Sequence, residues 1–492
     1  MEQKNRFLSV VVFCIVFSTV FFLPLQVWAE WKQEVQEIAA QNRPNHATSI
    51  DEAQIRGEFT ELLYHYESLD GQPIITPIAP EPSSPRVVIS NQEAVEDVEY
   101  LFSVMKYGYV GYQYFGGDER FGTAKERILE QLQARTSHEM AVRTFYDLLC
   151  DHLGFINDGH FYLGNRSFRR AQVMMMDFDY GFLRDENGYY TKRGGTKAYL
   201  ELVNGEPPDP YLWPALNGDG EIVYRIGRLR STDEGDDAFE LIELLLRAGE
   251  STRQDYAVIE PSTGSALDGD GYEQYSLDGV PVVSLRSFPY GSAMKDFVQD
   301  AYDLKLQDAF VIDLRSNRGG DTGALLEWME ILADGPIGFP HASVGLKTET
   351  VDTLARMSWP LIQPELYRPE KGWTEIMLHL ENIRIDNQAK IVVLTDSHTV
   401  SAGELFVELL RRVENVVFIG VNTAGAYLTG NPVWSSLPNS GLELHFGTAL
   451  FLAVDAGALV DREGKGFLPD FWVRPEDALD LAIRFIRNYG LK

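Results

Sequence analysis

Hydrophobic positions in the second half of the chain follow two alternating patterns. Short apolar runs, of the kind that parallel strands bury on both faces, occur at 282–285, 309–314 and 391–394. Each is followed by a segment with apolar residues at helical spacing, at 293–304, 324–332 and 403–412. This alternation of strand and helix predicts a layered α/β core over residues 279–492.

The pattern differs upstream of this core. Residues 91–165 have helical periodicity, with a capping box at Ser90 and Glu93 and further helices expected at 119–134 and from about 137 to the turn at 157. Short β-prone runs separated by turn residues predict a mostly β module at 166–278, with one inserted helix near 237–248. Residues 30–90 are expected to be an N-terminal extension that ends in a proline-rich linker over 73–85.

The first 29 residues are typical of a secretory signal peptide. Lys4 and Arg6 precede an apolar run, and Ala29 provides the small residue at the expected cleavage site. The alternative is an uncleaved N-terminal anchor, which the short length of the run disfavours. Either interpretation predicts that the working domains are secreted or periplasmic. We expect no integral membrane span after cleavage.

Composition excludes several classes of protein. A chain of 492 residues is expected to form two or three packed units, and 45% hydrophobic residues exclude global disorder. With 43 Lys and Arg against 73 Asp and Glu, the net charge of −30 argues against nucleic acid as a partner. Of the two cysteines, Cys14 lies in the signal, which leaves Cys150 alone and excludes a disulfide scaffold. No His or Cys has metal-ligand spacing, so we expect neither metal nor cofactor.

Two loops of the predicted core carry candidate chemistry. Ser401 and Glu404 lie between a buried strand and its helix, where they have the form of a capping box. A serine at such a turn also holds its hydroxyl near helix N-terminal amides that stabilise an oxyanion, as a nucleophile requires. Local sequence leaves both interpretations open. The second loop has Gly319 and Gly320 directly after a strand, where backbone amides can approach a ligand without hindrance from a Cβ atom.

Together these segments resemble the C-terminal processing peptidases, or tail-specific proteases, and their tricorn-like relatives. The resemblance rests on Asp313–Gly320 (DLRSNRGG), Ser401–Glu404 (SAGE), Ile419–Gly425 (IGVNTAG) and Glu463–Asp470 (EGKGFLPD), in that order. It covers about residues 280–475. It implies a crotonase-like layered core and a serine peptidase with Ser401 as nucleophile. It also implies an oxyanion hole formed by the amide of Ala402 with that of Gly319 or Gly320.

One departure from the family pattern bears on the mechanism. The family's Ser/Lys branch has its base directly after the last glycine of the third motif, and here that residue is Ala426. The tricorn-like branch uses a histidine from the preceding helical domain, and the turn that ends in His160 matches its motif. The resemblance therefore implies His160 as general base and Glu463 as supporting carboxylate. His398, three residues before Ser401, is the competing histidine.

Family members commonly carry a PDZ domain in the middle of the chain. Residues 202–206 resemble a late PDZ strand and residues 180–183 its carboxylate loop, so we expect a degenerate PDZ-like module at 166–278. The leading hypothesis is an exported serine peptidase that cleaves polypeptides through an acyl-enzyme. The alternative is a catalytically inactive ligand- or peptide-binding protein on the same fold. The sequence does not indicate an oligomeric state.

Overall fold

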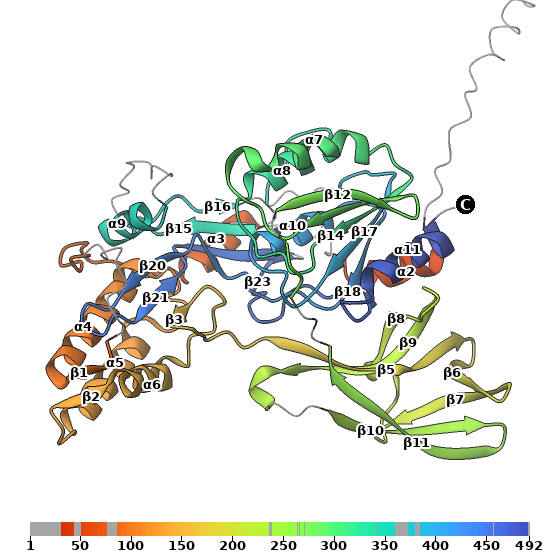
Figure 1. The fold of residues 1–492 in the computed structure, drawn as a ribbon, viewed down its shortest axis with the longest axis horizontal. Coiled ribbons are helices and arrows are strands. Elements are labelled where there is room, and N and C mark those ends of the chain that lie inside the picture. Colours follow the sequence, from red (N-terminus) through yellow and green to blue (C-terminus); the bar gives the residue numbers. More distant parts are fainter. Residues whose placement is uncertain are drawn as a thin grey trace, which may run out of the picture.

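The computed structural model shows a mixed α/β protein (Figure 1). The residues that it describes are 31–43, 51–75, 86–235, 239–262, 264, 266–269, 271–339, 341–359, 372–378, 384–455 and 457–490. The predicted signal peptide at 1–29 and most of the predicted proline-rich linker lie outside these residues. Both predictions therefore stay predictions.

A 13-stranded sheet runs through most of the molecule. Its strands, in spatial order, are β11 (Ser251–Pro261), β10 (Glu240–Ala248), β7 (Thr196–Val203), β6 (Gly188–Arg193), β5 (Gln172–Asp185), β9 (Ile222–Ser231), β8 (Leu212–Leu216), β24 (Phe471–Trp472), β18 (Val416–Gly420), β17 (Lys390–Thr395), β14 (Ala309–Asp313), β13 (Val280–Leu285) and β12 (Tyr272–Leu277). The stretch from β8 through β24, β18, β17 and β14 to β13 is parallel. Parallel strands end at one edge of a sheet, and their connecting loops gather there.

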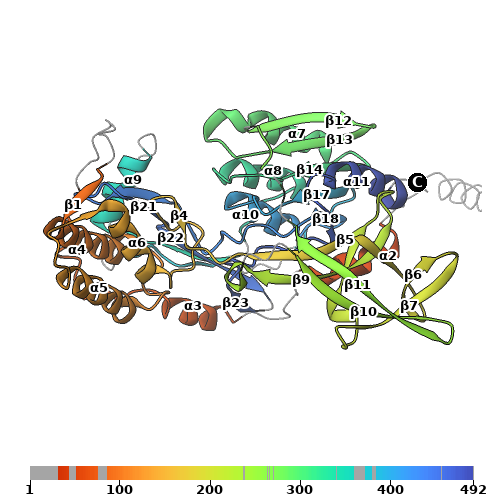
Figure 2. The ribbon, with the colours of Figure 1, turned by 60° about the horizontal axis from the view of Figure 1, so that its bottom comes forward.

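Alternate residues of the parallel strands enter two hydrophobic clusters. On one side Phe310 and Ile391 pack with α7 (Lys295–Leu304), α8 (Gly323–Ala333) and α10 (Ala402–Leu410). On the other side Val311 and Val392 pack with α2 (Gln33–Gln41), α11 (Ala478–Phe485) and the π-helix Ile486–Gly490. Figure 2 shows α7 and α8 beside β13 and β14. Burial of these strands on both faces explains why they form continuous apolar runs in the sequence.

The strands and helices predicted after residue 279 are present. Runs 282–285 and 391–394 lie in β13 and β17, and run 309–314 extends one residue beyond β14. The three helices coincide with α7, α8 and α10 to within two residues at each end. Their apolar spacing is unambiguous, because each strand run is flanked by turn residues.

Three helices follow the extension, as the sequence indicates. These are α4 (Asn91–Gly108), α5 (Gly117–Gln133) and α6 (Val142–Leu153). The predicted capping box at Ser90 and Glu93 is present in both directions, with the Ser90 hydroxyl accepting the Glu93 amide and the Glu93 carboxylate accepting the Ser90 amide. The third helix begins later than expected, because Glu139–Ala141 (β2) pairs with Val88–Ser90 (β1) instead.

The helical region shares its core with distant segments. Its hydrophobic cluster combines α4, α5 and α6 with α9 (Glu349–Ser358) and with two small sheets. The first small sheet contains β15 (His341–Gly345), β16 (Met377–Leu378), β19 (Thr429–Gly430), β22 (Ala449–Asp455) and β23 (Ala458–Val460). The second contains β3 (Tyr162–Leu163), β4 (Arg166–Ser167), β20 (Val433–Ser436) and β21 (Glu443–Phe446). Leu163 pairs with Leu444. Residues 91–165 are thus packed onto the C-terminal part of the chain.

The middle of the chain is β-structure that continues the large sheet. The prediction of a helix near 237–248 is wrong, because β10 occupies 240–248 and pairs with β11 and β7. Ile242, Leu244 and Leu246 are buried and the residues between them are more exposed, so pairing overrides the helical propensity of a leucine- and glutamate-rich segment. The suggested carboxylate loop at 180–183 is also wrong, since these residues lie within β5. A PDZ-like identity stays a prediction.

The N-terminal extension contains two helices that the sequence did not predict. Val35 and Ile38 of α2 are buried in the core cluster, and α3 (Glu52–Thr60) buries Phe59 in the helical region. In the described part of the chain, no helix combines the length and hydrophobicity that crossing a bilayer requires.

We expect Phe310→Ala to lower the free energy of unfolding by about 3–5 kcal/mol, because this ring is fully buried in the centre of the parallel sheet. Urea denaturation followed by circular dichroism measures the change. The control is Leu306→Ala, which removes a side chain that is 73% exposed and is expected to cost less than about 0.5 kcal/mol. Equal costs for the two variants would contradict the assigned core.

Candidate active site

Ser401 stands at the start of α10, after the loop that leaves β17. Its backbone has φ 54° and ψ −121°, a left-handed conformation that a non-glycine residue adopts only when its surroundings enforce it. The same strain is typical of nucleophiles at strand-to-helix turns. The Ser401 side chain makes no capping hydrogen bond to α10. The capping-box interpretation of Ser401 and Glu404 is therefore wrong.

The structure brings His160 to Ser401 across 241 residues of sequence. His160 Nε2 lies 3.2 Å from Ser401 Oγ, within hydrogen-bonding distance. The His160 amide donates to Asp158 Oδ1 at 2.8 Å. Asp158 also accepts the hydroxyls of Tyr109 at 2.7 Å and Thr429 at 2.9 Å, which lie in different parts of the fold. The loop that carries the imidazole is thus fixed from two sides.

Glu463 supports the same loop through its backbone. One carboxylate oxygen accepts the Gly159 amide at 2.7 Å, and the other accepts the amides of Tyr427 at 2.9 Å and Leu428 at 2.8 Å. Within the described residues His160 Nδ1 is buried without a hydrogen-bond partner. Glu463 is therefore a positioning residue that ties the loop before His160 to the turn after Gly425. It is not hydrogen-bonded to the ring.

Burial shifts the protonation of these groups in opposite directions. Desolvation lowers the pKa of His160 below its ordinary value; Asp158 opposes this shift and Arg169 adds to it. Burial, and then the nearby Asp158, raise the pKa of Glu463 well above its ordinary value. The imidazole is consequently neutral at neutral pH, which is the form that accepts a proton from a hydroxyl.

The two candidate glycines differ in the use of their amides. The Gly319 amide donates to Asn317 Oδ1 at 2.9 Å, whereas the amides of Gly320 and Ala402 have no acceptor among the described residues. A Cβ atom on Gly319 would lie 3.2 Å from Ser401 Oγ, so this loop runs beside the hydroxyl. The geometry therefore favours Gly320 over Gly319 as the partner of Ala402 in an oxyanion hole.

Asn317 fixes the distance between the glycine loop at 319–320 and the loop that carries Ser401. Its carbonyl accepts the Val400 amide at 2.9 Å, and its side-chain amide donates to Leu285 O at 3.0 Å. A Cβ atom on Gly403 would lie 2.8 Å from Asn317 Oδ1, so only glycine allows α10 to approach this closely.

His398, the competing histidine, is not part of this arrangement. Its ring is 44% exposed and lies 3.9 Å from Asp396, and no contact with Ser401 is present among the described residues. Proximity in sequence did not translate into proximity of side chains, because the turn at 396–400 directs residue 398 outward.

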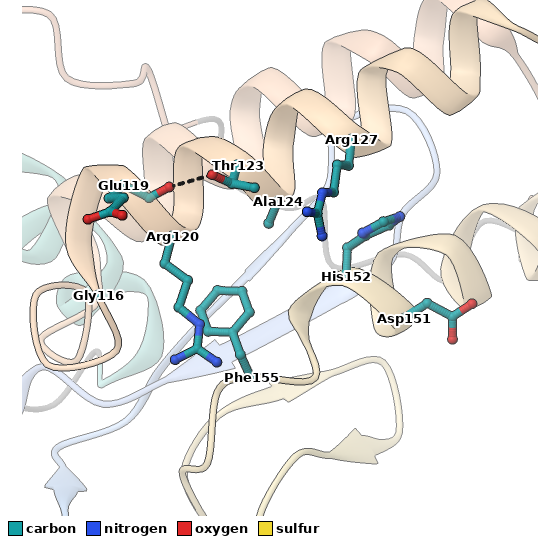
Figure 3. Close-up of a pocket in the computed structure, with 9 residues that line it drawn as sticks. All are labelled: Gly116, Glu119, Arg120, Thr123, Ala124, Arg127, Asp151, His152 and Phe155. Carbon is teal, nitrogen blue, oxygen red and sulfur yellow. Dashed lines mark hydrogen bonds between the residues drawn. The ribbon is translucent and has the colours of Figure 1, made fainter.

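A separate groove of about 530 Å³ lies between α5 and α6 (Figure 3). It is lined by Gly116, Glu119, Arg120, Thr123, Ala124, Arg127, Asp151, His152 and Phe155. Its histidine, His152, lies 2.8 Å from the side-chain amide of Gln131, and no serine or cysteine lines the groove. It therefore lacks the nucleophile and base that Ser401 and His160 present. In the described ranges no cluster of His, Cys, Asp and Glu has a geometry suited to a metal ion.

Residues 279–473 match the model of peptidase family S41. This segment contains Ser401, Glu463 and the glycine loop, in the order that the sequence motifs require. The chain is accordingly a serine-type peptidase, as its motifs predicted.

Three solved structures illustrate what the chain resembles. Mature CPAF aligns at 14% identity with a TM-score of 0.43, over 81% of this chain and 97% of the other. The photosystem II D1 C-terminal processing protease aligns at 15% identity with a TM-score of 0.36, over 81% and 98%. The tricorn protease aligns at 14% identity with a TM-score of 0.38, over 80% and 36%.

In the segment that matches family S41, the residue in place of the Ser/Lys-branch lysine is part of a packed contact. Ala426 donates its amide to Glu404 Oε2 at 2.7 Å, and Glu404 also accepts the Gly425 amide and the Thr423 hydroxyl. A Cβ atom on Gly159 would lie only 2.6 Å from Ala426 Cβ. The loop of His160 thus packs directly on the turn that Glu404 holds.

Sequence reasoning missed the structural role of Glu404 and the supports at Tyr109 and Thr429. Glu404 had a signal, its place in the family motif, but its Ser-x-x-Glu spacing indicated a cap. Tyr109 and Thr429 had no signal, because only the folded chain brings them to Asp158.

We expect Gly159→Ala to lower the free energy of unfolding by about 1–3 kcal/mol, because the new methyl group overlaps Ala426. Ala426→Gly in the same chain should recover part of this loss, a coupling that a double-mutant cycle in urea measures. The matched control is Gly122→Ala in α5, which meets nothing within 4 Å and should gain up to about 1 kcal/mol. Additive effects of Gly159→Ala and Ala426→Gly would refute the contact.

Proposed function

We propose that this S41 peptidase cleaves polypeptides with Ser401 as nucleophile and His160 as general base, positioned through Glu463, in place of a Ser/Lys dyad. The observation that carries the proposal is the 3.2 Å separation of His160 Nε2 and Ser401 Oγ. Proton transfer between a hydroxyl and a base requires such contact before any question of pKa arises.

The proposed reaction has two stages. Neutral His160 accepts the Ser401 proton as Oγ attacks the scissile carbonyl carbon, and the amides of Ala402 and Gly320 stabilise the oxyanion that forms. The imidazolium then donates its proton to the leaving amine, which breaks the peptide bond and leaves an acyl-enzyme. Water, deprotonated by His160, hydrolyses the ester and releases Ser401. Every proton passes through Nε2.

The exposure of the site residues is consistent with cleavage of a polypeptide. Ser401 and His160 are half-buried and Gly320 is exposed, whereas the supporting carboxyls of Asp158, Glu404 and Glu463 are buried. The two reacting residues are thus partly accessible to solvent, whereas the groups that hold them are protected from it. This division is what a peptidase acting on extended polypeptide needs.

We also propose that the protein is exported. The proposal rests on the apolar segment that ends at Ala29. N-terminal sequencing of the protein recovered from its native host is expected to begin at Glu30. A native chain that retains Lys4 and Arg6 would refute cleavage.

Ser401→Ala and His160→Gln are each expected to reduce kcat on unfolded casein by about 10⁴-fold or more, because each removes one partner of the proton transfer. His398→Gln is the control and should stay within about twofold of the wild type, since its ring does not contact Ser401. Mass spectrometry after treatment with a fluorophosphonate should show an adduct at Ser401. Wild-type activity of Ser401→Ala would refute the proposal, and a folded protein without an adduct would favour the binding-protein alternative.

The pH dependence of kcat/KM follows from the lowered pKa of His160. The neutral imidazole is the active form, so activity should rise as pH increases through an apparent pKa below about 6.5 and then stay level to about pH 8. A lysine base would instead give a rise above neutrality. Rates on an uncharged fluorogenic peptide from pH 4 to pH 9 distinguish the two, and a midpoint above about 7.5 would contradict His160 as base.

A further inference from the structure

Two adjoining cavities lie at the C-terminal end of α10. One, of about 490 Å³, lies between α2 and residues 411–416, and the other, of about 200 Å³, lies between the end of α10 and residues 462–468. The arginines in their linings are Arg43, Arg384, Arg411, Arg412 and Arg462. Because α10 has nine residues and is about 14 Å long, these cavities and Ser401 lie at opposite ends of the helix.

Three of these arginines converge on two aromatic rings. The guanidinium carbons of Arg43 and Arg411 lie 5.5 Å and 5.6 Å from the ring centre of Phe418. Those of Arg411 and Arg462 lie 5.7 Å and 5.4 Å from the ring centre of Phe467. The three side chains come from different segments of the chain. Folding, and not local sequence, therefore gathers them into one arginine cluster.

Two donors of the cluster have no acceptor. Arg43 Nη1 and Arg462 Nε are buried and make no hydrogen bond with any described residue. Arg43 Nη2 donates to Val416 O, and Arg411 Nη1 donates to Leu468 O at 3.2 Å. Buried N–H groups are nearly always hydrogen-bonded, so these two donors indicate an acceptor that the described part of the chain does not provide.

Carboxylates compensate the positive charge only in part. The cavities are lined by five arginines but by three carboxylates, which are those of Glu408, Glu414 and Asp455. Glu414 lies 2.5 Å from Arg384, and Asp455 lies 3.5 Å from Arg462. Neither Arg43 nor Arg411 has a carboxylate of a described residue within ion-pairing distance. In a protein with a net charge of −30, this local excess of cations is unusual.

The dipole of α10 explains only part of the cluster. Cations are favoured at a helix C-terminus, which accounts for Arg411 but not for Arg43 or Arg462, since these belong to other segments. Burial lowers the pKa of Arg411 to about 10; Asp470 opposes this shift, and Arg43 and Arg462 add to it. The guanidinium groups therefore repel one another. A multivalent anion between them would remove the repulsion and accept the unpaired N–H donors.

We propose that the two cavities bind a phosphate group, which Arg43, Arg411 and Arg462 hold by charge-assisted hydrogen bonds. Phosphate suits three guanidinium groups that approach from different segments, because it has nearly two negative charges and several acceptor oxygens, whereas a carboxylate has one charge and two oxygens. Arg43 follows α2, and the other two arginines belong to the α/β core. The bound group therefore bridges the N-terminal extension to that core.

The first test measures the midpoint of thermal unfolding in inorganic phosphate up to about 10 mM, with chloride keeping the ionic strength constant. We expect a saturable rise of about 2 °C or more, because a ligand that binds only the folded state stabilises it. The concentration stays low since concentrated phosphate stabilises proteins without binding to a site. O-phosphoserine in a parallel arm distinguishes a phosphorylated side chain from the free ion as the source of the group.

Substitutions connect this binding to the arginine cluster. Arg43→Gln and Arg462→Gln should each weaken phosphate binding by about tenfold or more in isothermal titration calorimetry, because a hydrogen bond to a charged group contributes this much. The matched control is Arg135→Gln, which removes an exposed arginine beyond the end of α5 and should bind phosphate as the wild type does. Thermal unfolding in chloride checks that each variant is folded. If Arg462→Gln does not fold, Arg43→Gln decides the question.

Hydrogen exchange tests the bridge itself. Phosphate should slow exchange about tenfold in residues 33–43 of the wild type but not of Arg43→Gln, and should leave the helical region at α4 unchanged. Three results would each overturn the inference: no saturable binding, binding that survives both substitutions, or a bound state in which residues 33–43 exchange as before. Each is independent of the role proposed for Ser401, because these experiments do not measure hydrolysis.

Discussion

The carboxylate of Glu463 forms the contact on which the rest of the site depends. It accepts one amide from the loop before His160 and two from the turn after Gly425, and so joins two parts of the chain that are more than 260 residues apart in sequence. Each hydrogen bond contributes about 0.5–1.5 kcal/mol, and an amide left without its acceptor in this buried place costs about 1–3 kcal/mol. The position of the imidazole therefore depends on a residue that does not contact it.

Glu404 and Asp158 extend the same design. Glu404 accepts hydrogen bonds from the turn at Thr423–Ala426. Asp158 accepts the His160 amide and the hydroxyls of Tyr109 and Thr429. Buried carboxyls are expensive unless their oxygens are satisfied, and here backbone amides and hydroxyls satisfy them. At the position of the Ser/Lys-branch lysine this chain thus has a turn that Glu404 and Glu463 hold through its backbone amides. Ala426 and Gly159 pack where a larger side chain on either residue would separate the two loops.

The sequence predicted those site residues that lie within a recognisable motif or directly after a buried strand. Ser401 and the glycine loop follow buried strands with unmistakable patterns, and the turn ending in His160 carries its own motif. The sequence did not reveal that Glu463 binds backbone amides and not the ring, because that depends on how three distant segments meet. The choice of Gly320 over Gly319 needed the hydrogen bond from Gly319 to Asn317. The segment 240–248 was misread for a similar reason: its leucines favour a helix, and only pairing with β7 and β11 makes it a strand.

The role of Glu463 in positioning the loop that brings His160 to Ser401 is tested most directly by a reaction rate. This is the rate at which a fluorophosphonate modifies Ser401 in Glu463→Gln, measured beside the wild type with thermal unfolding in parallel. The amide group of glutamine presents N–H donors where backbone N–H groups also donate, so the loop loses its anchor although volume is conserved. We expect a folded variant whose modification slows by about 10²-fold or more, because a base displaced by about 1 Å loses this much of its effect. A folded Glu463→Gln protein that reacts at the wild-type rate would contradict it.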